Sequence, residues 1–349
     1  MTPFKIGNRM VGPGLPACIT AEIGINHNGD LDLALRMIDA AAVAGADAVK
    51  FQNYRTEDFV SDRTLTHEYL RDGQWLVESQ YDLFKRCELS RAALATLKQR
   101  CDAMGVMFHS TPTSEAGLRD AVELGAPVNK NGSDFLTNHR LIEAMARTGL
   151  PTVLSTGMAT QVEIAAAVRA FRGAGNQQLI LLVCTSAYPT PIEELHLRRI
   201  GKLATTFDCP VGLSDHSEGT LAAVCGVALG ACWIEKHFTL DRRLPGPDQS
   251  FSADPLQFAE LVRAVRATEA MLGQEQIGPT TADQYGRRAF RLSCTAARTL
   301  AAGEAVGADD VAFRRPGTGL PPEDAERLIG RRLRHGVAAG ALLTVDDVS

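Results

Sequence analysis

The sequence predicts a (β/α)₈ TIM barrel followed by a small β-rich unit. Eight short apolar runs recur along the chain, and stretches with apolar residues at helical spacing lie between them. This alternation is typical of parallel βα units, and eight such units can close into a barrel. The predicted strands are 17–23, 48–52, 106–110, 127–131, 152–155, 179–184, 210–214 and 233–238.

Between these runs, the periodicity predicts helices at 31–44, 91–104, 139–147, 161–172 and 221–229, and a last barrel helix at 255–272. Residues 54–87 are polar and weakly periodic, so we expect a long βα loop over the active face. A doubly wound open sheet is the rival fold. It is disfavoured because no Gly-x-Gly-x-x-Gly motif follows the first predicted strand.

The last part of the chain differs in composition from the first. Residues 1–272 form the predicted barrel domain, and residues 273–288 are polar and form a predicted linker. Residues 289–349 contain short apolar runs separated by many glycines and prolines, a pattern typical of a small β-rich domain. A unit of this size buries a thin core, so we expect it to pack on its own barrel or on a partner.

Composition excludes several classes of protein. The 349 residues are 45% hydrophobic and 22% charged, with a formal net charge of −5. A mildly acidic chain lacks the basic footprint of a nucleic-acid-binding protein. We find no apolar run of membrane-spanning length and no signal peptide at residues 1–14, so we expect a cytoplasmic protein without a membrane partner. The eight cysteines form no Cys-x-x-Cys pair and are predicted to be buried free thiols.

Polar side chains lie where the predicted barrel strands end, which is where barrel enzymes place their active sites. His216 and His237 end neighbouring strands, so both imidazoles can reach one point. Two imidazoles, completed by water and substrate oxygens, suit a divalent ion such as Mn²⁺, Co²⁺ or Zn²⁺. The sequence therefore predicts a metal site at these two histidines.

Two lysines end otherwise apolar strands. Lys50 and Lys130 are costly to bury unless they are paired, so together they indicate an anionic ligand. Short hydroxyl side chains at other strand ends suit a phosphate and a carboxylate. They are Thr111, Ser133, Ser155 and Ser214. The alternative is a Schiff-base lysine of an aldolase, which these residues alone leave open.

Two carboxylates are candidates for binding an acceptor or for acid–base chemistry. Glu22 follows the first apolar run, and Asp248 lies in a rigid Pro-Gly-Pro-Asp turn.

Taken together, the motifs resemble the sialic acid (N-acetylneuraminate) synthase family, in order and over nearly the whole chain. The C-terminal part, with Arg-Arg-Pro-Gly at 314–317, resembles the SAF (antifreeze-like, β-clip) domain of that family. The matching barrel motifs are EIGINHNG at 22–29, VKFQ at 49–52, STP at 110–112, LSTGM at 154–158, YPT at 188–190, GLSDH at 212–216, EKHFT at 235–239 and PGPD at 245–248.

The resemblance implies a transferase that condenses phosphoenolpyruvate with the open-chain aldehyde of a 2-acetamido sugar and water, releasing phosphate by C–O cleavage. It implies a divalent metal on His216 and His237, Mn²⁺ in first place and Mg²⁺ or Co²⁺ as alternatives. It places phosphoenolpyruvate on Lys50, Thr111, Lys130, Ser133, Ser155 and Ser214. It places the acceptor sugar near Glu22, Gln52, Tyr188 and Asp248, with Glu22 also expected to handle the proton.

The resemblance also implies a domain-swapped homodimer, in which Arg315 of the SAF domain reaches over the barrel of a partner chain. Arginine suits that task because its planar fork can hold an acyl oxygen. The product would enter a cell-surface polysaccharide.

One departure from the family pattern concerns the acceptor. The stretch after the fourth-strand lysine usually reads Lys-Ile-Gly-Ser-Gly-Glu, whereas here Asn131 replaces an apolar residue and Asp134-Phe135 displaces the carboxylate by one position. N-acetylmannosamine and 6-deoxy diacetamido sugars both remain candidate acceptors. A metal-dependent pyruvate aldolase of the same barrel fold and a non-catalytic binding module are the alternative functions.

Overall fold

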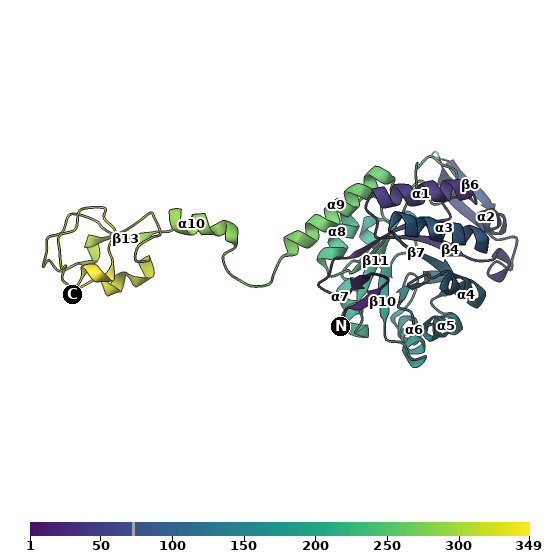
Figure 1. Cartoon of the computed structure of the whole chain (residues 1–349), viewed down its shortest axis with the longest axis horizontal. Helices are drawn as coiled ribbons and strands as arrows, with labels where there is room; N and C mark the ends of the chain where they lie inside the picture. Colours follow the sequence, from purple (N-terminus) through teal and green to yellow (C-terminus); the bar gives the residue numbers. More distant parts are fainter. Residues whose placement is uncertain (72–73) are drawn as a thin grey trace. The chain divides into compact units, whose positions relative to one another are not determined.

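The computed structural model describes residues 1–71 and 74–349. The chain divides into two compact units, Met1–Gly273 and Gln274–Ser349 (Figure 1).

Eight parallel strands form the centre of the first unit. They are β3 (Cys18–Gly24), β4 (Ala48–Asn53), β7 (Met107–Pro112), β8 (Asn129–Asn131), β9 (Thr152–Ser155), β10 (Leu179–Cys184), β11 (Val211–Asp215) and β12 (Trp233–His237). Their hydrogen-bonded order is β7-β4-β3-β12-β11-β10-β9-β8. The end strands β7 and β8 also contact each other, so the sheet curves into a nearly closed barrel. The predicted barrel is confirmed.

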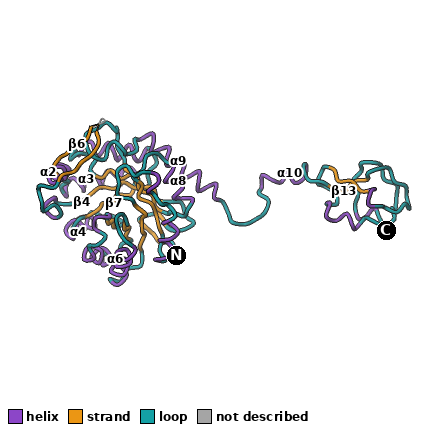
Figure 2. The backbone as a smooth tube through the Cα atoms, turned by 180° about the vertical axis from the view of Figure 1, so that it is seen from behind, coloured by secondary structure: helices purple, strands orange, loops and turns teal. Residues whose placement is uncertain are grey.

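Helices surround these strands (Figure 2). They are α1 (Leu31–Val43), α3 (Arg91–Met104), α4 (Glu115–Glu123), α5 (His139–Arg147), α6 (Gln161–Gly173), α7 (Arg199–Phe207), α8 (Leu221–Ala228) and α9 (Pro255–Leu272). Their starts follow local sequence signals. Asp254 caps α9 reciprocally with Gln257, and Pro255 occupies the first turn. Across the described part of the chain, no helix combines the length and apolar content needed to cross a membrane.

An N-terminal hairpin closes the amino end of the barrel. Strands β1 (Phe4–Ile6) and β2 (Arg9–Val11) pair antiparallel, and Ile6 and Val11 pack in one buried cluster with Trp233 and other residues at the strand starts. Arg9 fastens this hairpin through an ion pair of 2.5 Å with Asp47. The hairpin leaves the carboxyl ends of the strands as the open face.

The segment 54–87 is more ordered than the long loop that the sequence predicts. It contains a 3₁₀ turn η1 (Thr56–Asp58), a hairpin of β5 (Thr66–Arg71) and β6 (Gln74–Ser79), and α2 (Gln80–Cys87). Residues 72–73 of this range lie outside the described residues. The side chains of β6 are exposed or half-buried, so no strong apolar alternation marked this strand in the sequence.

The second unit has its own small core, which includes Cys294, Leu300 and Leu343. Strands β13 (Ser293–Ala296) and β14 (Val311–Arg314) pair antiparallel, and isolated bridges join other short segments. The remaining elements are the 3₁₀ turns η4 (Thr281–Asp283), η5 (Ala308–Asp310), η6 (Pro322–Arg327) and η7 (Val345–Asp347), and the short helix α10 (Gln284–Ala289). The turn η4 and most of α10 lie inside the range 273–288, where the sequence predicts only a linker.

Candidate active site

Four charged side chains meet inside the carboxyl end of the barrel, and we call them the lysine cluster: Glu22, Lys50, Lys130 and Glu235. Lys50 Nζ lies 3.3 Å from Glu22 Oε2 and 3.1 Å from Glu235 Oε2. Lys130 Nζ lies 3.8 Å from the same Glu235 oxygen. All four residues are buried, so two ammonium groups converge on one carboxylate oxygen in the barrel interior.

Burial and mutual charge set the ionisation of this cluster. Burial raises the pKa of the Glu22 carboxyl to about 7, although the Lys50 ammonium opposes the shift. Burial lowers the pKa of Lys130 to about 8, with Glu235 opposing and Lys50 adding to the shift. Burial alone would raise the pKa of Glu235, but Lys130 and Lys50 outweigh it and lower that pKa to about 2. Near neutral pH the cluster therefore holds two cations and at least one anion.

Short hydroxyl groups line the same region. Lys130 Nζ donates to Ser155 Oγ at 2.8 Å, and Lys50 Nζ donates to Thr111 Oγ1 at 3.4 Å. Ser133 Oγ accepts a hydrogen bond of 3.0 Å from the backbone N–H of Gly157. A Cβ at position 157 would come within 2.7 Å of that serine oxygen, so only glycine fits there.

The second group of side chains, the histidine cluster, contains Tyr188, His216, His237 and Asp248. The two imidazole centroids are 5.3 Å apart, and the Tyr188 ring lies 4.3 Å from that of His216. Asp248 Oδ2 lies 3.7 Å from His237 Nδ1. Burial raises the pKa of Asp248 to about 6, whereas burial and nearby positive charges, first that of His216, lower the pKa of His237 well below its usual value.

The two imidazoles fit a divalent metal. His216 Nδ1 donates to the carbonyl oxygen of Thr185 at 2.8 Å, so the lone pair of the neutral ring lies on Nε2, 3.4 Å from Ser214 Oγ. His237 Nδ1 is buried, and it has no hydrogen-bond partner among the described residues. Within that same part of the chain no three His, Cys, Asp or Glu side chains form a ready metal cage, so water and substrate would complete the ligand set.

Strand register joins the two clusters. Glu22 on β3 pairs with His237 on β12 and with Lys50 on β4. A register shift between Glu22 and Gly24 interrupts the β3–β4 pairing, and Gly24 adopts a φ of +54°. A Cβ at Gly24 would lie 3.1 Å from Glu22 Oε1 and 3.6 Å from Gln52 Nε2, so both side chains flank this bulge.

The structure thus brings the predicted barrel residues to one end of the barrel, including Ser214, whose Oγ lies 3.4 Å from His216 Nε2. Arg315 belongs to the second unit, where its Nε donates to the carbonyl oxygen of Phe290 at 3.1 Å. In the departing segment, Asp134 is exposed, and the Phe135 ring packs 6.4 Å from that of Phe59.

Sequence reasoning missed the central role of Glu235. Its Oε2 contacts both lysines, while its Oε1 accepts from Trp233 Nε1 at 3.4 Å. A glutamate in a short apolar run was the available signal, since burying a carboxylate requires a charged partner.

The family models match most of the chain. The NeuB family matches residues 37–277, and the SAF domain matches residues 293–349. The chain belongs to the NeuB family. The SAF match covers nearly all of the β-rich region that the sequence set apart.

Several relatives of the chain carry sugar-acid synthase names. The chain is 36% identical to the N,N'-diacetyllegionaminic acid synthase of Legionella pneumophila over 341 residues, covering 97% of this chain and 96% of that protein. It is 34% identical to the N-acetylneuraminate-9-phosphate synthase of Homo sapiens over 329 residues, covering 93% and 90%. The crystal structure of N-acetylneuraminic acid (sialic acid) synthetase from Leptospira borgpetersenii matches with a TM-score of 0.74 at 35% identity, covering 82% of this chain and 95% of that chain.

Proposed function

We propose that this protein is a nonulosonic acid synthase that condenses phosphoenolpyruvate with the aldehyde of a 2-acetamido sugar and water, releasing phosphate. The observation that carries the proposal is the convergence of Lys50 and Lys130 on one buried carboxylate oxygen, beside a pair of facing imidazoles. Buried ammonium groups at a barrel mouth suit a multiply charged anion, and the names of the relatives give the reaction class.

In this proposal the lysine cluster binds phosphoenolpyruvate. The ammonium groups of Lys50 and Lys130 hold its phosphate and carboxylate, and Thr111, Ser133, Ser155 and Ser214 donate hydroxyl hydrogen bonds to the same groups. The bound anion takes over the lysines from Glu22 and Glu235, so the protein exchanges an internal ion pair for one with the substrate.

The reaction forms one C–C bond and one C–O bond, the latter to the oxygen of water, and it breaks the C–O bond to phosphate. The enol carbon of phosphoenolpyruvate attacks the sugar aldehyde, whose oxygen takes up a proton. Water then adds to the resulting oxocarbenium carbon and loses a proton. The tetrahedral intermediate expels phosphate by cleavage of its C–O bond, while its hydroxyl loses a proton and becomes the keto oxygen of the product. Glu22, with a pKa of about 7, is poised to give or take a proton near neutral pH.

The acceptor sugar is assigned to the histidine cluster. When bound to His216 and His237, a divalent metal, Mn²⁺ in first place, would polarise the aldehyde as a Lewis acid. Gln52, Tyr188, Asp248 and Glu22 orient the sugar, and Arg315 of a partner chain in a swapped homodimer holds its acyl group. N-acetylmannosamine and a 6-deoxy diacetamido sugar are the two acceptors that we propose, because an N-acetylneuraminic acid synthetase and a diacetyllegionaminic acid synthase are 35% and 36% identical to this chain.

Phosphate release from phosphoenolpyruvate tests the proposal. The protein is incubated with Mn²⁺ and a panel of acetamido sugars, and products are detected by mass. We expect phosphate and a nonulosonic acid in equal amounts, and the loss of both in a chelator. Turnover of pyruvate in place of phosphoenolpyruvate would indicate a pyruvate aldolase, and inertness towards every sugar would indicate a binding module.

Phosphoenolpyruvate labelled with ¹⁸O in its bridging oxygen tests the cleavage step. Under C–O cleavage the label leaves with phosphate. Label retained in the sugar acid would require P–O cleavage and would overturn the proposed mechanism.

A further inference from the structure

Asp248 lies on an irregular loop, so its position depends on side-chain contacts. The loop runs from the end of β12 to the start of α9, and Asp248 follows Pro245-Gly-Pro in its middle. A carboxylate on such a loop can approach His237 only if the backbone is held in place. Ser252 Oγ donates to the carbonyl oxygen of Asp248 at 2.5 Å, and it accepts from Asn26 Nδ2 at 2.9 Å.

Gln249, next in the chain, ties the same loop to its surroundings. Its Nε2 donates to the carbonyl oxygen of Asn26 at 2.8 Å and to that of Pro245 at 3.3 Å. Its Oε1 accepts from the hydroxyl of Thr239. Gln249 is only 1% exposed, so each of these bonds forms away from bulk water. Its amide thereby joins the β3–α1 loop, the start of the β12–α9 loop and the Pro-Gly-Pro turn.

Asn26 completes this buried network from the other side. Its Nδ2 also donates to the carbonyl oxygen of Phe238 at 2.9 Å, directly after His237. Asn28 adds a bond of 2.7 Å from its Nδ2 to the carbonyl oxygen of Pro245. The loop that carries Asp248 is therefore fixed against the strand that carries Glu22 and against the residue that follows His237. Buried hydrogen-bond networks of this kind rigidify the groups they join, although Asn26 Oδ1 itself has no hydrogen-bond partner among the described residues.

We propose that Gln249 is a positioning residue that fixes the Asp248 carboxylate beside His237 and thereby sets the affinity for the acceptor sugar. It acts through Thr239 and the backbone of Asn26 and Pro245, without touching the reacting atoms. The effect on acceptor affinity rests on the proposed function, whereas the hydrogen bonds by which Gln249 holds the loop do not.

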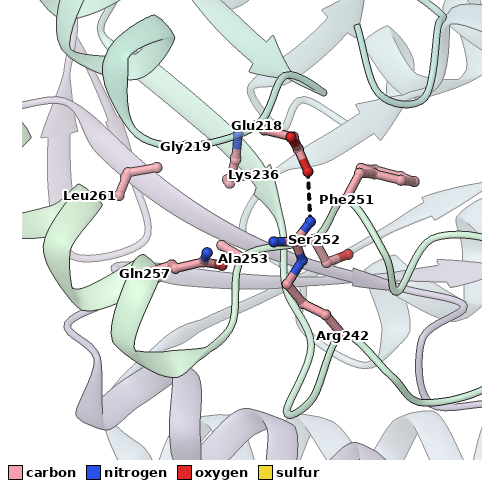
Figure 3. Close-up of a pocket in the computed structure, with 9 residues that line it drawn as sticks. All are labelled: Glu218, Gly219, Lys236, Arg242, Phe251, Ser252, Ala253, Gln257 and Leu261. Atoms are coloured by element: carbon pink, nitrogen blue, oxygen red, sulfur yellow. Dashed lines mark hydrogen bonds and ion pairs between the residues drawn. The ribbon is translucent and has the colours of Figure 1, made fainter. Parts of the chain in front are cut away.

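An exposed ion pair of the same loop offers a matched control. Arg242 contacts Glu218 at 2.7 Å (Figure 3). Its Nε also donates to the carbonyl oxygen of Ser250 at 2.6 Å. The Glu218 side chain is 64% exposed, so water can replace this ion pair at little cost. Glu218→Gln removes the charge and keeps the Arg242–Ser250 bond, so we expect no change beyond twofold in either KM.

The test variant is Gln249→Met, which keeps the length of the side chain and removes its three hydrogen bonds. We expect the KM for the sugar to rise about tenfold or more, because small misplacements of a binding group are costly. The KM for phosphoenolpyruvate should stay within twofold. Hydrogen exchange of backbone amides in residues 244–253 should quicken, while the barrel strands keep their protection.

A second pair of variants covers the case in which Gln249→Met fails to fold. Thr239→Val removes the hydroxyl that holds the Gln249 amide, and Thr239→Ser keeps it. We expect the valine variant to raise the sugar KM and to quicken exchange in the loop, and the serine variant to match the wild type. Equal behaviour of the two Thr239 variants would overturn the proposal.

Two further results would also overturn it. One is an unchanged sugar KM in a folded Gln249→Met protein, and the other is an equal rise in both KM values. A wild-type protein that consumes no phosphoenolpyruvate with any sugar would refute the proposed function instead. The exchange measurement would then still decide whether Gln249 holds the loop.

Discussion

The lysine cluster and the histidine cluster occupy the same end of one barrel, yet their charges are satisfied to different degrees. Each lysine in the first cluster already contacts a carboxylate, at 3.1 Å for Lys50 and 3.8 Å for Lys130. In the second cluster His237 keeps a buried nitrogen without a hydrogen-bond partner among the described residues. The charges of the lysine cluster are thus paired within the protein. The histidine cluster keeps an imidazole nitrogen that is available to a ligand.

The largest expected effect comes from removing the His237 imidazole. His237→Ala should lower kcat/KM about 10³-fold or more, because a polarising ion supplies several kcal/mol to the transition state. Mn²⁺ binding, followed by calorimetry, should be lost, while phosphoenolpyruvate binding should persist because Lys50 and Lys130 remain. A variant that keeps more than a tenth of the wild-type activity would contradict the proposal that the histidine cluster holds the metal and the acceptor sugar.

The next effect comes from breaking the ion pairs of the lysine cluster. Glu235→Gln should lower the free energy of unfolding by about 3–5 kcal/mol, since it leaves buried ammonium groups without their shared partner. Denaturant titration measures the change. The exposed pair of Arg140 and Glu115, 2.6 Å apart, is the control, and Glu115→Gln should cost less than about 1 kcal/mol. Equal losses in the two variants would show that burial does not increase the contribution of the cluster's ion pairs to the free energy of unfolding.

A smaller effect should appear as a function of pH. The pKa of Lys130 is about 8, below its usual 10.5, so this ammonium loses its proton as the pH rises through about 8. The kcat/KM for phosphoenolpyruvate should therefore fall by up to about tenfold for each pH unit above this value. Lys130→Arg, which keeps its charge, should flatten the profile up to about pH 10. A wild-type profile that stays flat to that pH would contradict the shifted pKa.

The smallest effect concerns a histidine that belongs to neither cluster. His109 on β7 is fully buried next to Trp233, and neither ring nitrogen has a hydrogen-bond partner in the described structure. Burial lowers its pKa to about 3, so the ring is neutral. His109→Leu should raise the free energy of unfolding by about 1 kcal/mol, measured by denaturant titration. A loss of stability would indicate that buried water satisfies the ring.

Much of the fold could be predicted from the sequence because each barrel strand is a buried apolar run. Every predicted strand overlaps an observed one, and β9 and β10 match residue for residue. The strands that the sequence did not predict are short or exposed. The hairpin of β1 and β2 has three residues in each strand, too few to show a period, and the side chains of β6 are exposed or half-buried.

The candidate site shows a similar limit. The polar ends of the strands could be predicted, because parallel strands of a barrel all end on one face. The contacts across the barrel could not. Glu235 lies on β12, whereas its partners Lys50 and Lys130 come from β4 and β8, so only the closed barrel brings them together. The roles of the individual residues stay predictions until the variants are measured.

The N-terminal hairpin limits access to the interior of the barrel. Ile6 and Val11 seal its amino end with apolar side chains. Under the proposed function, substrates and products would therefore pass through the face formed by the carboxyl ends of the strands.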